Sequence, residues 1–294
     1  MRWDDSHESP DVIDRRGEER SSGGVGGAGL FYVIFWLLRR PWGWAVLLVV
    51  GVGYYVYGRA VAPTDDSRRL HQARGEGSGA LDRASPEVHF VSFVLDDVQG
   101  SWDHVFASAA AGSKGASYRH AKLVLYTDET RTACGEGSAA TGPFYCPPDE
   151  RVYLDLGFFN QLSGRLGARG QFAQAYVIAH EVGHHVQKIL GLSNRGTGHG
   201  EASGSVRLEL QADCFAGIWA HSTKQRNLLE SGDIDSALGA AAAVGDDRLQ
   251  RAAAGTVHPE SFTHGSSEER KRWFTRGYTS GAIDACDTFH AASL

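Results

Sequence analysis

The chain has 294 residues, a formal net charge of -6 at pH 7 and 42% hydrophobic residues. This composition is ordinary for a globular protein, and the length allows one or two domains. No stretch rich in Lys or Arg stands out along the sequence. These features exclude a general nucleic-acid binder, so we expect no nucleic-acid partner.

Residues 1–29 are charged at first and then rich in glycine and serine. A segment with so few apolar groups cannot offset the free-energy cost of ordering its backbone. The sequence therefore predicts a disordered lead over residues 1–29.

Residues 30–58 are almost wholly apolar and are interrupted by Arg39-Arg40-Pro41. The second apolar run, Trp42 to Tyr57, is slightly shorter than the roughly 20 residues of a spanning helix, but its Trp and Tyr residues suit the membrane interface. A buried core helix is the alternative, and such a helix seldom carries aromatic ends and a preceding Arg pair. We expect a single-pass anchor over residues 30–58, with the lipid bilayer as a partner.

The Arg39-Arg40 pair lies on the amino side of the second run, and positive charge favours the cytoplasmic side of a membrane. This places the N-terminus in the cytoplasm and the bulk of the chain outside the cell membrane. Ala60-Val-Ala62 has the small-x-small form of a signal-peptidase site, but Pro63 follows it directly and the lead is long. We therefore expect an uncleaved anchor.

Residues 59–86 have the composition of a flexible linker, so the folded domain is expected at residues 87–294. Its apolar patterns predict a mixed first half and a helical second half, which together make an α+β fold. The expected strands are 88–95, 121–126 and 151–156, and the expected helices are 98–111, 171–190, 205–224, 233–244 and 266–278. The strand at 151–156 is either a core strand or an edge strand that pairs with an extended peptide.

Four cysteines all follow the apolar segment, and none forms a Cys-x-x-Cys pair. An even number of cysteines outside the cytoplasm is typical of disulfides, and buried free thiols are the alternative. Of the three connectivities, the best closes a Gly/Pro-rich loop with Cys134–Cys146 and ties the chain end to the core with Cys214–Cys286. Each bond would stabilise the domain by roughly 3 kcal/mol through the entropy of the unfolded chain.

The sequence His180-Glu181-Val182-Gly183-His184 lies within a stretch whose apolar spacing predicts a helix. Residues four apart share one face of a helix, so both imidazoles can face a single metal ion. Glu181 lies one step round and can reach a water on that ion. This pattern predicts His180 and His184 as zinc ligands and Glu181 as a general base.

A catalytic zinc site needs a third protein ligand and keeps one position open for water. The metzincin spacing would require Gly at 187 and His at 190, but the chain has Gln187 and Leu190. Glu209 and Asp213 share a face of the next predicted helix, within an apolar segment. We expect Glu209 as the third ligand, a gluzincin arrangement, and Asp213 as the partner of the other ring nitrogen of a liganding histidine. Glu201 is a weaker candidate because it lies in a Gly-rich loop.

Further motifs extend the pattern over most of the chain. They are Met1-Arg-Trp3, Cys134-Gly-x-Gly137, Gly142-Pro-Phe-Tyr-Cys146, Ala175-Tyr-Val-Ile-Ala-His-Glu-Val-Gly-His-His-Val-Gln187, Leu210-Gln-Ala-Asp-Cys-Phe-Ala-Gly217, Gly245-Asp-Asp-Arg248 and Ser261-Phe-Thr-His264. In these motifs the chain resembles the bacterial neutral zinc metallopeptidases with one membrane segment. The resemblance implies a zincin-like domain, Zn²⁺ as cofactor, and peptide or protein substrates.

The stretch from Thr263 to Arg270 is similar to the Thr-His-Pro-x4-Arg element of membrane-associated gluzincins, with Gly265 in place of proline. The similarity implies that His264 either stabilises the oxyanion or acts as a reversible fourth ligand. Ser266 and Glu269 have the spacing of a capping box, which predicts the start of the last helix.

These features together predict a membrane-anchored zinc endopeptidase whose catalytic domain lies outside the cytoplasm. Two other functions use the same residues. One is a membrane-tethered scaffold that keeps zinc for structure, which would not need Glu181. The other is a zinc hydrolase of cell-wall amide bonds, which would activate water in the same way.

Overall fold

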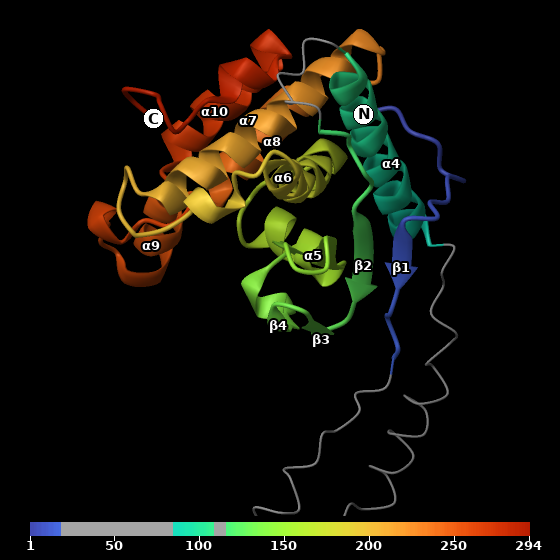
Figure 1. The fold of residues 1–294 in the computed structure, drawn as a ribbon. Helices are drawn as coiled ribbons and strands as arrows, with labels where there is room; N and C mark the ends of the chain where they lie inside the picture. Colours follow the sequence, from blue (N-terminus) through green and yellow to red (C-terminus); the bar gives the residue numbers. More distant parts are fainter. Residues whose placement is uncertain (19–84, 109–115) are drawn as a thin grey trace, which may run out of the picture. The chain divides into compact units, whose positions relative to one another are not determined.

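The computed structural model describes residues 1–18, 85–108 and 116–294. The expected anchor at 30–58 lies outside the described residues, and so does nearly all of the expected linker. Residues 1–16 and the chain from residue 85 onward form one compact unit (Figure 1). Within the described ranges, no helix is long and apolar enough to cross a membrane.

A four-stranded sheet has the order β1-β2-β6-β5. Its strands are β1 (Val12–Asp14), β2 (Lys122–Tyr126), β6 (Arg151–Asp155) and β5 (Phe144–Cys146). The first three are parallel, and β5 pairs antiparallel with β6. The strands predicted at 121–126 and 151–156 are confirmed. However, β6 lies between two other strands, so the edge-strand interpretation of 151–156 is wrong and β5 is the outer strand. A separate hairpin joins β3 (Glu129–Thr132) and β4 (Gly135–Ser138).

The first 18 residues are ordered, which corrects the prediction of a disordered lead for this part of residues 1–29. β1 pairs with β2, and Trp3 packs edge-on against Phe90 with ring centroids 5.2 Å apart. The Met1 amino nitrogen lies 3.1 Å from an Asp233 carboxylate oxygen. The prediction failed because this segment is ordered by docking onto the core of a distant part of the chain, which composition alone does not reveal.

One long helix, α4 (Pro86–Ala107), shows that the predicted strand at 88–95 is wrong and contains most of the predicted helix at 98–111, whose residues 109–111 lie outside the described part of the chain. Ser85 caps it by accepting a hydrogen bond from the Val88 backbone nitrogen, and proline occupies the first helical turn. Proline there has a fixed φ that suits a helix and lacks only an N–H that would be unpaired anyway. The run of Val and Phe residues favoured a strand, but their burial follows the helical period.

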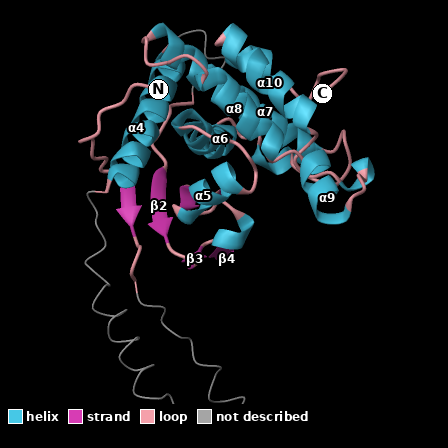
Figure 2. Cartoon of the chain, turned by 180° about the vertical axis from the view of Figure 1, so that it is seen from behind, coloured by secondary structure: helices cyan, strands magenta, loops and turns pink. Residues whose placement is uncertain are grey.

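Six further α-helices complete the described part of the chain. They are α5 (Gly157–Gly164), α6 (Gln171–Ile189), α7 (Gly204–Gln225), α8 (Asp233–Ala243), α9 (Asp246–Ala254) and α10 (Ser267–Ser280). The helices predicted at 171–190, 205–224, 233–244 and 266–278 are confirmed, and so is the capping box of Ser266 and Glu269. α6 packs against α4, α7 and α8, which places it at the centre of the helical layer (Figure 2). The fold is α+β.

Two glycines allow α7 and α10 to pack backbone to backbone. A Cβ atom on Gly217 would lie 2.1 Å from the Phe274 carbonyl oxygen, and one on Gly277 would lie 1.9 Å from the Cys214 carbonyl oxygen. Both distances are far below van der Waals contact, so any side chain would force the helices apart. This close packing fixes the position of α7 against α10.

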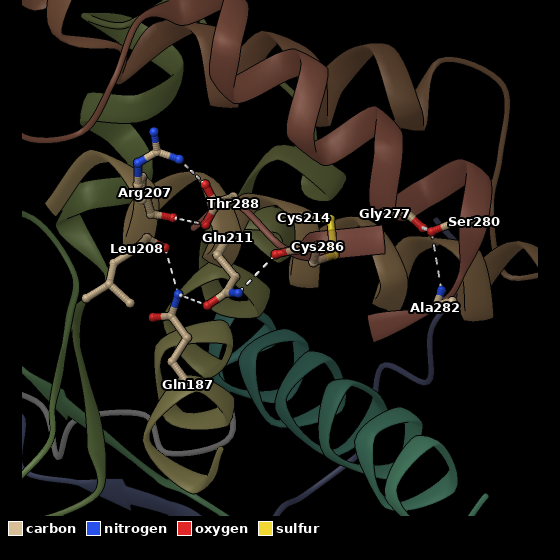
Figure 3. The surroundings of a disulfide bond; sticks show 10 residues. All are labelled: Gln187, Arg207, Leu208, Gln211, Cys214, Gly277, Ser280, Ala282, Cys286 and Thr288. Carbon is tan, nitrogen blue, oxygen red and sulfur yellow. Dashed lines mark hydrogen bonds between the residues drawn. A yellow bond between two sulfur atoms is a disulfide. The ribbon is translucent and has the colours of Figure 1, made fainter. Parts of the chain in front are cut away.

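Both predicted disulfides are present. Cys134–Cys146 and Cys214–Cys286 have Cα separations of 5.8 and 5.6 Å, which are ordinary for such bonds. Figure 3 shows the second bond joining α7 to the last segment of the chain, where the Gln211 side-chain amide also donates to the Cys286 carbonyl oxygen at 2.9 Å. The chain end therefore holds the helix that carries Glu209.

Candidate metal centre

Three metal-ligating side chains converge from two helices. His180 and His184 lie on successive turns of α6, and Glu209 lies on α7. One Glu209 oxygen is 3.2 Å from His180 Nε2, and the other is 3.5 Å from His184 Nε2. One ligand atom from each residue falls within a cluster no wider than 4.8 Å. The structure therefore gathers the three residues that the sequence predicted as ligands.

These separations fit a zinc ion. Zinc bonds of 2.0–2.1 Å in tetrahedral geometry place neighbouring ligand atoms about 3.3 Å apart. The measured separations of 3.2 and 3.5 Å lie on either side of that value. Two imidazoles and one carboxylate also form a ligand set of catalytic zinc sites, which leave a fourth position open.

Gly183 lets the two helices come close enough to share an ion. A Cβ atom at this position would lie 3.0 Å from the Ala212 carbonyl oxygen and 3.2 Å from its Cα atom. Those atoms belong to the α7 backbone and cannot move aside easily. The glycine between the two histidines is therefore required by the packing of α6 against α7.

Asp213 orients the first histidine. Its Oδ1 atom lies 2.9 Å from His180 Nδ1, and the Asp213 side chain is fully buried. A carboxylate at this position accepts the Nδ1 proton, which leaves the Nε2 lone pair directed at the metal position. Glu209 and Asp213 lie one turn apart on α7, so one helix supplies both the ligand and the partner of another ligand.

Arg270 and Tyr176 complete the surroundings of Asp213, and the sequence analysis assigned neither a role. Arg270 Nε and Nη2 donate to the two Asp213 oxygens at 2.7 and 2.9 Å, and the Tyr176 hydroxyl donates to the same carboxylate. The Arg270 side chain is itself only 3% exposed, so its positive charge lies beside the buried Asp213 carboxylate and balances it. Two signals were available: Tyr176 precedes His180 by one helical turn, and Arg270 ends the Thr-His-x5-Arg stretch.

Gln187 performs the corresponding task for the second histidine. Its Oε1 atom lies 2.9 Å from His184 Nδ1, and its Nε2 donates to the Leu208 carbonyl oxygen at 2.7 Å. Figure 3 shows Gln187 beside Leu208 and Gln211, which are on α7. The sequence analysis used Gln187 only to exclude metzincin spacing. Its amide in fact ties the His184 ring to the next helix.

Charge distribution in the centre favours cation binding. Burial lowers the pKa of the His180 imidazole, but the Asp213 and Glu209 carboxylates outweigh it and raise that pKa to about 10. Burial raises the pKa of Glu209, yet the nearby histidines hold it well below its usual range. The centre therefore binds positive charge. Without metal this charge is a proton, and a metal ion that binds there displaces the proton.

Glu181 is buried and lines the same cavity as the three ligand residues. Burial raises the pKa of its carboxyl, although His184 and His180 oppose that shift. A carboxylate with a raised pKa is a stronger base toward a nearby water. Its environment suits proton transfer.

His264 lines the cavity from the loop before α10 and is half exposed. Its Nδ1 lies 3.1 Å from Asp246 Oδ1, and Asp246 Oδ2 accepts from the backbone nitrogens of Thr263 and His264 at 2.6 and 2.7 Å. The hydrogen bond to Asp246 raises the pKa of His264. The sequence analysis gave Asp246 only as part of the Gly245-Asp-Asp-Arg248 motif, whereas the structure shows that it fixes the loop that carries His264.

The cavity is a cleft of about 940 Å³, and the three ligand residues are part of its lining. Its lining includes Phe144 and Tyr145 of the outer strand β5 and the apolar side chains of Phe158, Leu166 and Leu249. An outer strand beside the centre can pair with an extended peptide backbone, and the apolar walls can take its side chains.

Comparisons with known proteins agree with this geometry. A family model described as "Putative neutral zinc metallopeptidase" matches residues 1–289. The uncharacterized protein YpfJ of Escherichia coli K12 is 44% identical over 299 residues, covering 98% of this chain and 99% of that protein. The uncharacterized protein Rv2575 of Mycobacterium tuberculosis H37Rv is 46% identical over 190 residues, covering 60% of this chain and 65% of that protein. No solved structure matches the chain.

Proposed function

Because the chain belongs to the neutral zinc metallopeptidase family, we propose that it is a zinc-dependent endopeptidase of the gluzincin type with a zincin-like catalytic domain. The observation that carries the proposal is the placement of Glu209, whose two oxygens reach one imidazole each at 3.2 and 3.5 Å. A ligand set of this kind, beside a buried glutamate that is not a ligand, is typical of a hydrolytic site.

His180, His184 and Glu209 would hold the zinc ion. When bound, zinc supplies a water of lowered pKa and polarises the carbonyl of the scissile bond. Glu181 takes the proton of the attacking water and later passes it to the leaving amine, since peptide cleavage needs a base and then an acid. Asp213 and Gln187 keep both imidazole rings in place throughout.

His264 acts as an oxyanion stabiliser in this proposal. The Asp246 hydrogen bond occupies Nδ1 and raises the pKa of the ring, which favours the doubly protonated form. The protonated Nε2 then donates to the negative oxygen that develops during attack. Loss of such a donor typically costs roughly 100-fold or more in rate. The other role considered, a reversible fourth ligand, would use the unprotonated Nε2 of the same ring.

In this proposal the substrate is an extended peptide that binds along β5. The protein is attached to the bilayer through residues 30–58, and its catalytic domain lies outside the cytoplasm. The cleft walls favour apolar side chains on the substrate. Cell-wall amide bonds are the second candidate, because the same water chemistry cleaves them. The buried Glu181 opposes a purely structural zinc site, which needs no base.

The test is hydrolysis by purified full-length protein loaded with zinc. We expect cleavage of unfolded protein and of peptides with apolar residues, and no cleavage of cell-wall fragments. The Glu181→Gln variant is the matched control, since it removes the base and leaves the ligands intact. Cleavage of cell-wall fragments alone would replace the proposal with the second candidate, and no cleavage of either would favour the scaffold.

A further inference from the structure

We propose that His185 is a positioning residue, which sets where the substrate-binding wall of the cleft lies relative to the metal centre. The inference deepens the proposed function and rests on it, because it concerns how a peptide is aligned for cleavage. His185 directly follows the ligand His184 on α6. The contact that carries the inference joins His185 to Tyr145 of the outer strand β5.

One continuous stretch of chain forms part of the cleft. Residues 140–145 all line the cavity, together with the three ligand residues. We call this stretch the β5 wall, because its last two residues, Phe144 and Tyr145, belong to β5. The proposed peptide substrate binds along that strand. The position of the β5 wall therefore fixes the position of the peptide backbone.

Two features hold the β5 wall to the strands of the domain. β5 pairs antiparallel with β6 in the register Tyr145 to Val152. The disulfide between Cys134 and Cys146 closes the loop that contains the wall. Both features join the wall to other strands, whereas two of the metal ligands lie on α6. The alignment of the wall with the metal centre therefore depends on its contacts with that helix.

His185 makes such a contact through both of its ring nitrogens. The residue is 0% exposed. Its Nε2 lies 2.7 Å from the Arg119 carbonyl oxygen, and its Nδ1 lies 2.9 Å from the Tyr145 hydroxyl oxygen. A carbonyl oxygen can only accept, so Nε2 carries the proton, and in the neutral ring Nδ1 accepts from the Tyr145 hydroxyl. The ring thus holds the β5 wall and has no nitrogen left for a metal ion.

The hydrogen bond between Tyr145 and His185 is shielded from water. Tyr145 is 9% exposed, and its ring packs edge-on against the His185 ring with centroids 5.5 Å apart. A buried hydrogen bond is costly to break, because the group that remains loses its partner and gains no water. Since His184 and His185 are consecutive, one turn of α6 holds both a metal ligand and the β5 wall.

A second contact between α6 and the chain after β5 is more exposed. The Lys188 ammonium donates to the Pro147 carbonyl oxygen and lies 2.8 Å from Glu150 Oε1. The Lys188 side chain is 28% exposed, and ion pairs open to solvent contribute little. The buried contact of His185 is therefore the one that we expect to set the alignment.

Two tyrosines provide a matched test, because both rings pack against His185. The Tyr118 ring lies 5.8 Å from the His185 ring between centroids, but its hydroxyl has no hydrogen-bond partner in the described part of the chain. Tyr145→Phe and Tyr118→Phe each remove one oxygen atom, and only the first removes a hydrogen bond. Substitution of His185 itself would also break the contact with Arg119, so the change is made on Tyr145.

The measurements use the full-length protein loaded with zinc. They are zinc content, kcat and KM for a peptide, and backbone hydrogen exchange of residues 140–147 without substrate. We expect Tyr145→Phe to keep about one zinc per chain and to lower kcat roughly 10-fold or more, because a misplaced substrate reacts slowly. KM should change by less than about threefold, because β6 and the disulfide keep the wall formed. Exchange of residues 140–147 should be faster, and Tyr118→Phe should match wild type throughout.

Unchanged exchange in Tyr145→Phe, or faster exchange with an unchanged kcat, would overturn the inference. Equal losses in the two variants, or loss of zinc from Tyr145→Phe, would also overturn it. Hydrogen exchange does not depend on turnover. A wild-type protein that cleaves no peptide would therefore end the proposed function, while the exchange rates would still decide whether His185 holds the β5 wall.

Discussion

The metal centre and the N-terminal arm, which is residues 1–16, contrast in how the sequence encodes them. At the centre, His180 and His184 are four residues apart on one helix, and Glu209 and Asp213 are four apart on the next. In the arm, Asp11 depends on Gln99 and on residues near 120, so its contacts span about a hundred residues. The comparison teaches that a site whose residues repeat at helical spacing can be recognised in a sequence. A segment that is ordered only by contacts with distant residues has the composition of a disordered tail.

The largest expected effect is at Glu181 and concerns the centre. Glu181→Gln should retain zinc and lose activity by roughly 1,000-fold, within the range attributed to general acid–base catalysis. Metal analysis and peptide hydrolysis on the same preparation measure both quantities. A variant that loses its zinc would make Glu181 a ligand, and one with normal turnover would remove its role as the base.

The next effect concerns the arm. Asp11→Ala removes a buried carboxylate and leaves Gln99, His120 and Lys122 without their partner, which should lower the free energy of unfolding by about 2–3 kcal/mol. Asp5→Ala, an exposed position of the same arm, is the matched control and should change it by less than about 0.5 kcal/mol. Denaturant unfolding compares the two. Equal stabilities would show that the arm is not part of the cooperative unit.

A smaller effect separates ligands from the residues that orient them. Asp213→Asn keeps the shape of the side chain but removes the charge that pairs with Arg270 and orients His180. Zinc affinity should fall roughly 10- to 100-fold, as is usual when such a partner is lost. Competition with a chelator measures it. An unchanged affinity in a folded variant would mean that the His180 ring is held by its helix alone.

The smallest effect is a pH dependence at the contact between His120 and Asp11 of the arm. Burial lowers the pKa of His120, but hydrogen bonds to Asp103 and Asp11 outweigh it and raise that pKa. A raised pKa in the folded state gives stability that is fully present below the unfolded value of about 6.5 and is lost as pH rises through the folded value. Because His120 is 42% exposed, solvent screening keeps the effect well under about 1 kcal/mol. Between pH 5.5 and 8.5 the loss of unfolding free energy should be smaller in His120→Gln than in wild type, while His180 and His264, whose pKa values are also raised, contribute equally to both. The same slope in both proteins would assign it elsewhere.

Much of the centre could be predicted because its geometry is local. Helical spacing identified the three ligand candidates and Asp213, and loop composition identified the disulfide pairs. Arg270 and Asp246 were missed because each acts on a residue far along the chain, and a single sequence does not show such contacts. The helix α4 was misread because a run of Val and Phe outweighed the Ser85-Pro86 start signal. The arm was missed for the same reason as Arg270, since its partners lie on other elements.

The measurement that tests the account most directly is the zinc content of Glu209→Gln after dialysis against a mild chelator. Glu201→Gln, which changes an exposed glutamate in the neighbouring loop, is the matched control, and circular dichroism checks that both variants are folded. We predict about one zinc per chain in wild type and Glu201→Gln, and almost none in Glu209→Gln, because two imidazoles alone are too few to complete a zinc site. Equal zinc in Glu209→Gln and wild type would contradict the assignment of the third ligand and with it the gluzincin centre.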